Sequence, residues 1–137
     1  MIALWHLIQQ KNIHHSEIDL LNQKEYGYDE ARMIQVFQNI LGNAYKFTDE
    51  SGMIQTKFIE KDGQLNISIF NTGKKIPEED IELIFDKFYQ SKNQNIRKPI
   101  GTGLGLAICK KIIEAHKGEI SAENKEIGVV FNIKLNS

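Results

Sequence analysis

The segment that begins at Asp29 constrains the fold more than any other part of the chain. Asp29 suits the N-cap position, where its side chain can accept a hydrogen bond from a main-chain N–H of the first helical turn. Apolar side chains then recur at helical spacing on one face: Ile34, Phe37, Ile40, Leu41, Ala44 and Tyr45. The pattern therefore predicts a long helix with one apolar stripe.

Strands are predicted on both sides of two turns. Lys61-Asp62-Gly63 is a short turn with glycine where positive φ is expected, so the strands around it should form a β-hairpin. A second hairpin is predicted around Gly128. The predicted strands cover residues 53–59, 64–70, 119–124 and 127–135, and residues 12–20 are a further strand candidate.

Three shorter segments complete the predicted elements. Residues 1–10 are densely apolar and suit a helix docked on a core, and residues 104–115 return to a helical pattern. Pro77 and the three acidic residues after it suit the first turn of a short helix that ends near Ile84. Residues 91–100 are polar and without a period, so we expect a mobile loop of the kind that often forms a lid.

Length and charge limit the classes of protein. With 137 residues, 41% of them hydrophobic, the chain should form one domain over residues 1–137. A net charge of −1 offers no basic field for nucleic acid, and the single cysteine, Cys109, excludes an intrachain disulfide. No apolar run approaches the roughly 20 residues that span a bilayer, so we expect a soluble cytoplasmic fragment without direct membrane contact.

Three polar residues of the predicted long helix share one face. Asn39, Asn43 and Lys46 fall at positions i, i+4 and i+7, opposite much of the apolar stripe. An asparagine oxygen is a suitable ligand for Mg²⁺, and a lysine supplies a point charge for phosphate. Taken alone, these residues are better interpreted as a solvated helix face.

A glycine-rich turn runs directly into the predicted helix 104–115. The turn reads Gly101-Thr102-Gly103-Leu104-Gly105, and it can bring main-chain N–H groups and a positive helix end close to an anion. It matches neither the dinucleotide-binding fingerprint nor the P-loop. Such a turn is as often a backbone hinge as a phosphate site.

Two more segments could face a pocket. Asn71-Thr72-Gly73 with Ile76-Pro77 ends a strand and turns toward the short helix, although an ordinary turn would look the same. Phe85, Phe88 and Tyr89 form an aromatic cluster that could equally be core packing.

In this order, the segments resemble the catalytic and ATP-binding domain of sensor histidine kinases, a branch of the GHKL-type ATPases. The four boxes of that family are similar to QVFQNILGNAYKFT, FNTGKKIP, FDKFYQ and GTGLGLAICKKIIEAH. The resemblance runs from about Asp29 to the end of the chain. It implies a two-layer α/β sandwich in which about three helices cover a mixed, largely antiparallel sheet, with a mobile ATP lid.

The resemblance also implies roles for individual residues. Asn43 would ligate Mg²⁺, with Asn39 beside it and Lys46 near the phosphates, and these three would form the catalytic set. Asn71 would meet the adenine amino group, and Gly73 would allow close approach of the adenine ring. Gly101, Gly103 and Gly105 would line the phosphates under the lid, and the remaining nucleotide contacts would come from Phe47, Ile76, Phe88, Tyr89, Thr102, Leu104 and Leu106.

By this resemblance the chain would use ATP and Mg²⁺ to phosphorylate a histidine on a separate helical hairpin domain of the same protein. A response regulator receiver domain would be the next partner, and the parent protein would be membrane-anchored. His14 and His15 are adjacent on a predicted strand and lack the family's acceptor pattern, so neither is expected to accept phosphate. The fragment alone should not autophosphorylate.

Three alternatives stay open from the sequence. GHKL-type ATPases of the topoisomerase, mismatch-repair or chaperone kind, and anti-sigma-factor serine kinases, typically carry Glu where this chain has Asn39, and Asn cannot take a proton from water. A degenerate domain that senses nucleotide or binds a partner is the third. It is favoured by Asn71 and Lys75, which stand where the family usually has Asp and Gly.

Overall fold

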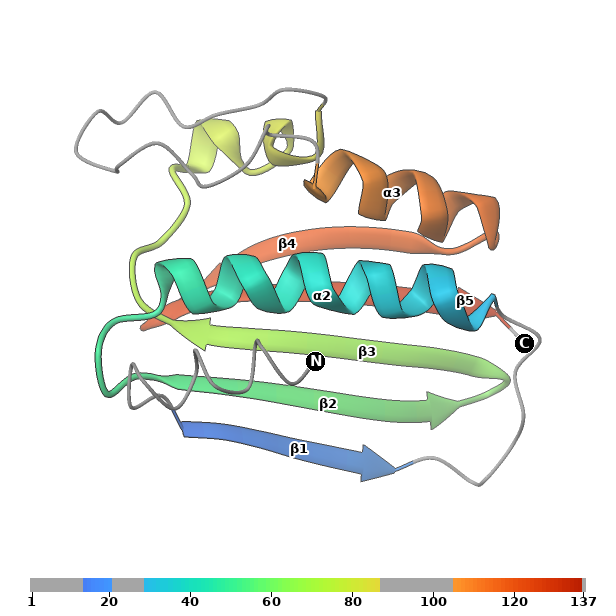
Figure 1. Ribbon diagram of the computed structural model, residues 1–137, viewed down its shortest axis with the longest axis horizontal. Coiled ribbons are helices and arrows are strands. Elements are labelled where there is room, and N and C mark those ends of the chain that lie inside the picture. The colour runs from blue at the N-terminus through green and yellow to red at the C-terminus, as the bar shows by residue number, and fades with distance from the viewer. Residues whose placement is uncertain (1–13, 21–28, 87–104, 137) are drawn as a thin grey trace.

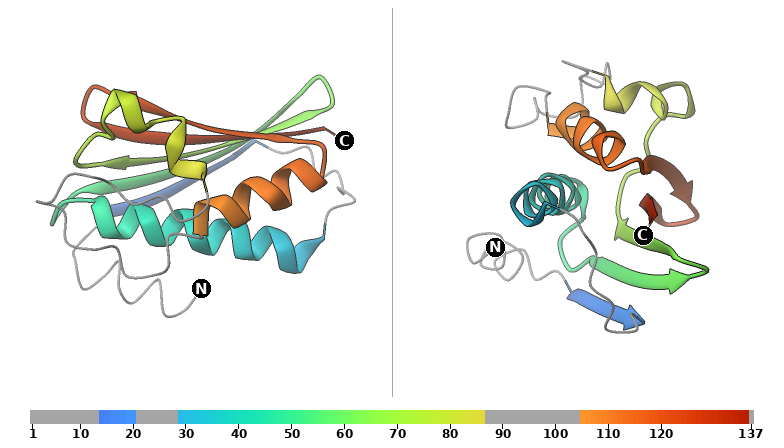
Figure 2. Two further views of the ribbon diagram at one scale, coloured as in Figure 1. Left: turned by 90° about the horizontal axis from the view of Figure 1, so that it is seen from above. Right: turned by 90° about the vertical axis from the view of Figure 1, so that its right-hand side faces the viewer.

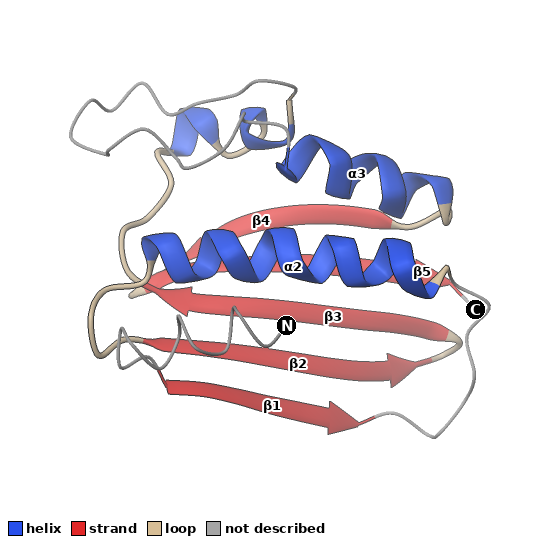
Figure 3. Ribbon diagram, in the orientation of Figure 1, coloured by secondary structure: helices blue, strands red, loops and turns tan. Residues whose placement is uncertain are grey.

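The strands of the described part of the chain form one five-stranded sheet (Figure 1). The computed structural model describes residues 14–20, 29–86 and 105–136. The sheet order is β1-β2-β3-β5-β4, in which β1 pairs with β2 in parallel and the other neighbours pair antiparallel (Figure 3). The strands are β1 (His14–Leu20), β2 (Met53–Lys61), β3 (Gln64–Thr72), β4 (Glu119–Lys125) and β5 (Gly128–Asn136).

Two α-helices in the described part of the chain cover the same face of this sheet (Figure 2). They are α2 (Glu30–Phe47) and α3 (Gly105–Ala115), and two 3-10 turns, η1 (Glu78–Asp80) and η2 (Leu83–Phe85), precede α3 in the chain. The predicted two-layer α/β sandwich with a mixed, largely antiparallel sheet is confirmed. The helix predicted for residues 1–10 and the lid predicted for 91–100 lie outside the described residues.

The buried face of α2 differs by one position from the predicted stripe. Ile40, Leu41 and Ala44 are buried as expected, but Ile34 is 43% exposed and Met33 takes its place in the core. Met33 continues the three- and four-residue spacing of the buried positions 36, 40 and 44. Ile34 is rotated by about 100° from Met33 and lies at the edge of that stripe. The sheet offers the apolar layer beneath α2 through buried residues of β2, β3 and β5: Ile54, Leu65, Ile67, Ile69, Val129, Phe131, Ile133 and Leu135.

The N-terminal end of α2 is capped as predicted and is tied to α3. Asp29 has extended backbone, and its Oδ1 accepts a hydrogen bond from Arg32 N at 3.2 Å. The main-chain N–H of Asp29 in turn donates to Nε2 of His116, just after α3, at 3.2 Å. The structure thereby makes His116, which no sequence motif singles out, a bridge between the two helices.

The predicted hairpins form, with longer strands than expected. Asp62 and Gly63 both have positive φ, 55° and 75°, which is the backbone of a tight two-residue hairpin turn. The predicted ends of β2 and β3 are wrong by two residues each, because cross-strand pairing continues beyond them. In the second hairpin, Ile127 belongs to the turn and is 60% exposed, so β5 begins at Gly128.

The short helix predicted after Pro77 is replaced by η1 and η2. Pro77 has extended backbone, with ψ 135°, and therefore precedes the first turn. Phe85, in η2, is buried and packs edge-to-face on Phe131 of β5 with ring centroids 6.2 Å apart, so this aromatic residue belongs to the core. None of the described helices has both the length and the apolar character that a membrane span requires.

Candidate functional site

The polar face of α2 is turned toward the start of α3. Asn39, Asn43 and Lys46 are all half-buried. The side chain of Asn39 donates through Nδ2 to the main-chain oxygen of Gly105 at 3.3 Å. This face is therefore not the freely solvated helix surface that the three residues alone suggested.

Lys46 lies near the C-terminal end of this face. Partial burial lowers the pKa of its ammonium group from 10.5, because desolvation disfavours the charged form. An anionic group beside Lys46 would offset that cost. Lys46 is the basic residue that the last turn of α2 can offer to an anion.

Asn71 lies within β3 and is only 3% exposed. Its Nδ2 donates to the main-chain oxygen of Thr72 at 3.0 Å. Since an asparagine amide has one donor group and one acceptor oxygen, this bond fixes the flip of the amide and presents Oδ1 as its acceptor.

Gly73 follows β3 and touches the end of α2. Its φ is 132°, a conformation that residues with a side chain rarely adopt, and a Cβ added to it would lie 2.3 Å from the main-chain oxygen of Phe47. The resemblance assigned the glycine to close approach of an adenine ring. The structure adds a reason within the chain, because only glycine lets the end of β3 reach the end of α2.

Phe47 and Ile76 border the region where these two ends meet. Phe47 is the last residue of α2 and is 36% exposed, whereas Ile76 is partly buried against the core. Both main-chain polar groups of Ile76 bond to the side chain of Asn124, which sequence analysis did not identify. Asn124 lies on the inward-facing side of β4, the side that also carries Ile120 and Ala122. A polar residue in that alternating pattern is the signal that could have identified it.

The start of α3 completes the part of the site that the structure describes. Gly105 and Leu106 are half-buried, and Gly105 lies against Asn39. The structure therefore brings together Asn39, the end of β3 and the N-terminal end of α3 around α2. The remaining predicted site residues lie outside the described residues: Phe88, Tyr89, Gly101, Thr102, Gly103 and Leu104.

A Mg²⁺ ion would find few protein ligands here. Within the described ranges no group of three or more His, Cys, Asp or Glu side chains could hold a metal. Mg²⁺ commonly keeps several waters and binds through one or two protein oxygens together with substrate phosphates. A half-buried asparagine such as Asn43 fits that pattern.

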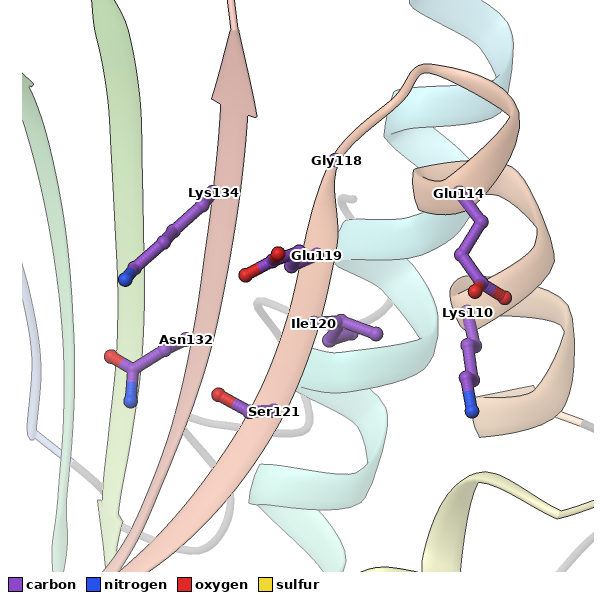
Figure 4. A pocket seen from close by; sticks show the side chains of 8 residues that line it. All are labelled: Lys110, Glu114, Gly118, Glu119, Ile120, Ser121, Asn132 and Lys134. Atoms are coloured by element: carbon purple, nitrogen blue, oxygen red, sulfur yellow. The ribbon is translucent and has the colours of Figure 1, made fainter.

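A cavity of about 300 Å³ lies elsewhere, at the sheet edge by α3 and β4 (Figure 4). Its lining includes Lys110 and Glu114 of α3 and Ser121 of β4, and none of the predicted site residues. Charges of both signs surround it, without the convergent donors that a phosphate would need. We therefore do not assign the nucleotide to this cavity.

Comparison with known proteins agrees with the geometry. The model of the histidine kinase-, DNA gyrase B- and HSP90-like ATPase family matches residues 28–137. The sensor protein VanSC of Enterococcus gallinarum is 33% identical over 129 residues, which cover 94% of this chain and 35% of that protein. The sensor histidine kinase WalK of Bacillus subtilis is 40% identical over 100 residues, which cover 72% of this chain and 16% of that protein.

Solved structures give the same result. The nucleotide-free catalytic domain of the histidine kinase ThkA superposes with a TM-score of 0.86 at 36% identity, covering 98% of this chain and 86% of that chain. ThkA in complex with the response regulator protein TrrA superposes with a TM-score of 0.81 at 32% identity, covering 98% and 37%. The chain spans about a third or less of the curated relatives named above. It belongs to the histidine kinase-, DNA gyrase B- and HSP90-like ATPases, as a catalytic domain of the sensor histidine kinase type.

Proposed function

We propose that this chain binds Mg²⁺-ATP between α2 and residues 71–76 and, within a longer sensor kinase, transfers the γ-phosphate to a histidine. One observation carries the proposal: segments distant in sequence meet at α2. Asn39 bonds to Gly105, and Gly73 packs on Phe47. A polar helix face, an inward-facing buried amide and a helix N-terminus thereby surround one region.

Each group has a role in this proposal. The Oδ1 atom of Asn71 accepts a hydrogen bond from the adenine amino group, and Lys46 binds a phosphate oxygen. Asn43 holds the Mg²⁺, with Asn39 beside it, and the ion supplies neutralisation of charge on the transferring phosphate. The N-terminal end of α3, from Gly105, directs a positive helix end toward the phosphates.

We propose that the acceptor histidine comes from another domain. His14 and His15 lie in β1, and His116 is occupied: its ring bonds to Asp29 N and, at 2.8 Å, to the main-chain oxygen of Ile112. We infer that the protein's own dimerisation and phosphoacceptor domain supplies the histidine, and that a response regulator receiver domain takes the phosphate from it. The structure of ThkA in complex with the response regulator protein TrrA supports a receiver domain as a partner. We also propose that the domain works in the cytoplasm, where ATP and a receiver domain would be available, and that its parent protein is anchored in the membrane.

An ATP-hydrolysing role is disfavoured by Asn39. Hydrolysis needs a general base to activate water, and the amide of Asn39 donates to Gly105 O and cannot take a proton. A degenerate module that binds only a partner is the second candidate, favoured by Asn71 in place of an aspartate. Nucleotide titration separates it from the main proposal.

Two measurements test the proposed function. Calorimetry with ATP, with and without Mg²⁺, should show metal-enhanced binding that Asn43→Ala abolishes while the fold is retained. Incubation with γ-labelled ATP should leave almost no acid-labile phosphohistidine on this chain. The absence of nucleotide binding would favour the degenerate module, and labelled histidine on this chain would contradict the separate acceptor.

A further inference from the structure

Residues 71–76, the segment that carries the proposed base-recognition residues, are held in place by contacts with the β4–β5 hairpin. The turn of this hairpin lies beside the end of β3 (Figure 1). The main-chain N–H of Gly73 donates to Ile127 O at 3.1 Å, and a Cβ added to Gly128 would lie 1.9 Å from Asn71 O. The hairpin turn and the first residue of β5 are therefore in direct contact with the start of residues 71–76.

Asn124 holds the other end of this segment. Its Oδ1 accepts from Ile76 N at 2.9 Å, and its Nδ2 donates to Ile76 O at 2.7 Å. Nδ2 also lies 3.1 Å from Oε1 of Glu78, which accepts from it. One side chain thus satisfies both main-chain polar groups of Ile76, as a neighbouring strand would.

Few residue types can make this pair of bonds. An asparagine amide carries a donor and an acceptor in one plane, whereas aspartate only accepts and leucine does neither. Pro77 lacks an N–H and restrains Ile76 to extended backbone. Ile76 is therefore held extended beside β4, where the side chain of Asn124 can bond to both of its main-chain polar groups. The segment does not need to continue as a strand for these bonds to form.

We propose that Asn124 is a positioning residue for the nucleotide base, because its amide fixes the main chain of Ile76 and with it the wall formed by residues 71–76. The inference rests on the proposed function, in which Asn71 and Ile76 contact the base. Lys74 and Lys75, between these two contacts, are exposed. Beyond the end of the β3–β5 pairing at Thr72, hydrogen bonds from Gly73 N to Ile127 O and between Ile76 and Asn124 attach this segment to the hairpin.

The test compares ATP with inorganic tripolyphosphate, which shares the phosphates and lacks the base. Asn124→Ala should raise the Kd for ATP about 10-fold, since two main-chain hydrogen bonds are lost, and leave the Kd for tripolyphosphate unchanged. Exchange of the Ile76 amide hydrogen, followed by NMR, should accelerate in the same variant. Asn132→Ala is the matched control, an asparagine of β5 on the opposite face of the sheet (Figure 4), and it should change neither quantity.

Two further variants keep the proposal testable if Asn124→Ala folds poorly. Asn124→Gln retains both groups and should lose less ATP affinity than alanine, whereas Asn124→Asp keeps only the acceptor and places a carboxylate beside Glu78, so it should lose as much as alanine. Unchanged ATP affinity with unchanged Ile76 exchange would overturn the role of Asn124. Equal weakening of ATP and tripolyphosphate would overturn it too, and a native chain that binds no ATP would instead remove the proposed function.

Discussion

Asn71→Asp should change stability and ATP affinity in opposite directions. In the native chain, Nδ2 of Asn71 donates to Thr72 O at 3.0 Å, and the side chain is 3% exposed. An ionised carboxylate has no hydrogen to donate, so two acceptors would face each other in a buried place. The lost bond and the unpaired acceptor should lower the free energy of unfolding by about 1–3 kcal/mol.

ATP affinity should rise in the same variant. The bond from the adenine amino group would become charge-assisted, and such bonds are roughly twice as strong as neutral bonds worth about 1 kcal/mol net. A gain of about 1 kcal/mol corresponds to a Kd about fivefold lower. GTP should not gain, because guanine offers an oxygen at the equivalent place and the carboxylate offers another acceptor.

The native amide should already favour ATP. To meet the guanine oxygen, Asn71 would have to turn Nδ2 toward the base and give up its bond to Thr72 O. That loss is about 1 kcal/mol or more, so the Kd for GTP should exceed the Kd for ATP by about fivefold or more. The Thr72 bond therefore keeps some base discrimination without an aspartate.

Calorimetric titration with ATP and GTP, together with urea unfolding in the absence of nucleotide, measures all these quantities. Asn66→Asp is the control, because Asn66 lies in the same strand on the opposite face and is half-buried. Unchanged Kd values for both nucleotides in Asn71→Asp would show that Asn71 does not contact the base. The adenine pocket would then have been placed wrongly.

Three further predictions concern the helices and the turn after β3. Burial raises the pKa of the Cys109 thiol from 9.0 to about 11, so its stabilising contribution should be complete below pH 9 and lost as the pH rises to about 11. Urea unfolding should show a loss of up to about 3 kcal/mol over that window that Cys109→Ala does not share, and equal slopes would contradict it. Gly73→Ala should lower the free energy of unfolding by about 3 kcal/mol or more, since its Cβ would meet Phe47 O; a change below about 1 kcal/mol would refute the close approach. His116→Ala should cost about 1 kcal/mol and speed amide exchange at Asp29, whose N–H loses its acceptor, and unaltered exchange there would argue against the bridge.

Local chemistry explains what the sequence predicted well. The Asp29 cap depends on residues within one helical turn, and the Asp62-Gly63 hairpin depends on two adjacent residues with positive φ. Patterns of this kind are complete within a short window. The error at Ile34 arose because apolar residues occur on both sides of the true stripe, and only the sheet beneath decides which set is buried.

Long-range contacts explain what was missed. Asn124 and Ile76 are 48 residues apart, and His116 and Asp29 are 87 apart. No local pattern reveals which main-chain group a side chain will meet after the strands pair. The family resemblance identified the site residues by their positions in the sequence. The hydrogen bonds of Asn124 and His116 could not be identified in that way, because they depend on the tertiary fold of this chain.

In the proposed function, α2 and residues 71–76 together form an ATP site. NMR spectra of the ¹⁵N-labelled chain during titration with Mg²⁺-ATP test it most directly. Amide signals of residues 39–46, 71–76 and the start of α3 should shift together with one Kd, while those of β1 stay in place. Shifts confined to the cavity by Lys110 and Ser121, or no shifts at millimolar ATP, would contradict this placement of the site.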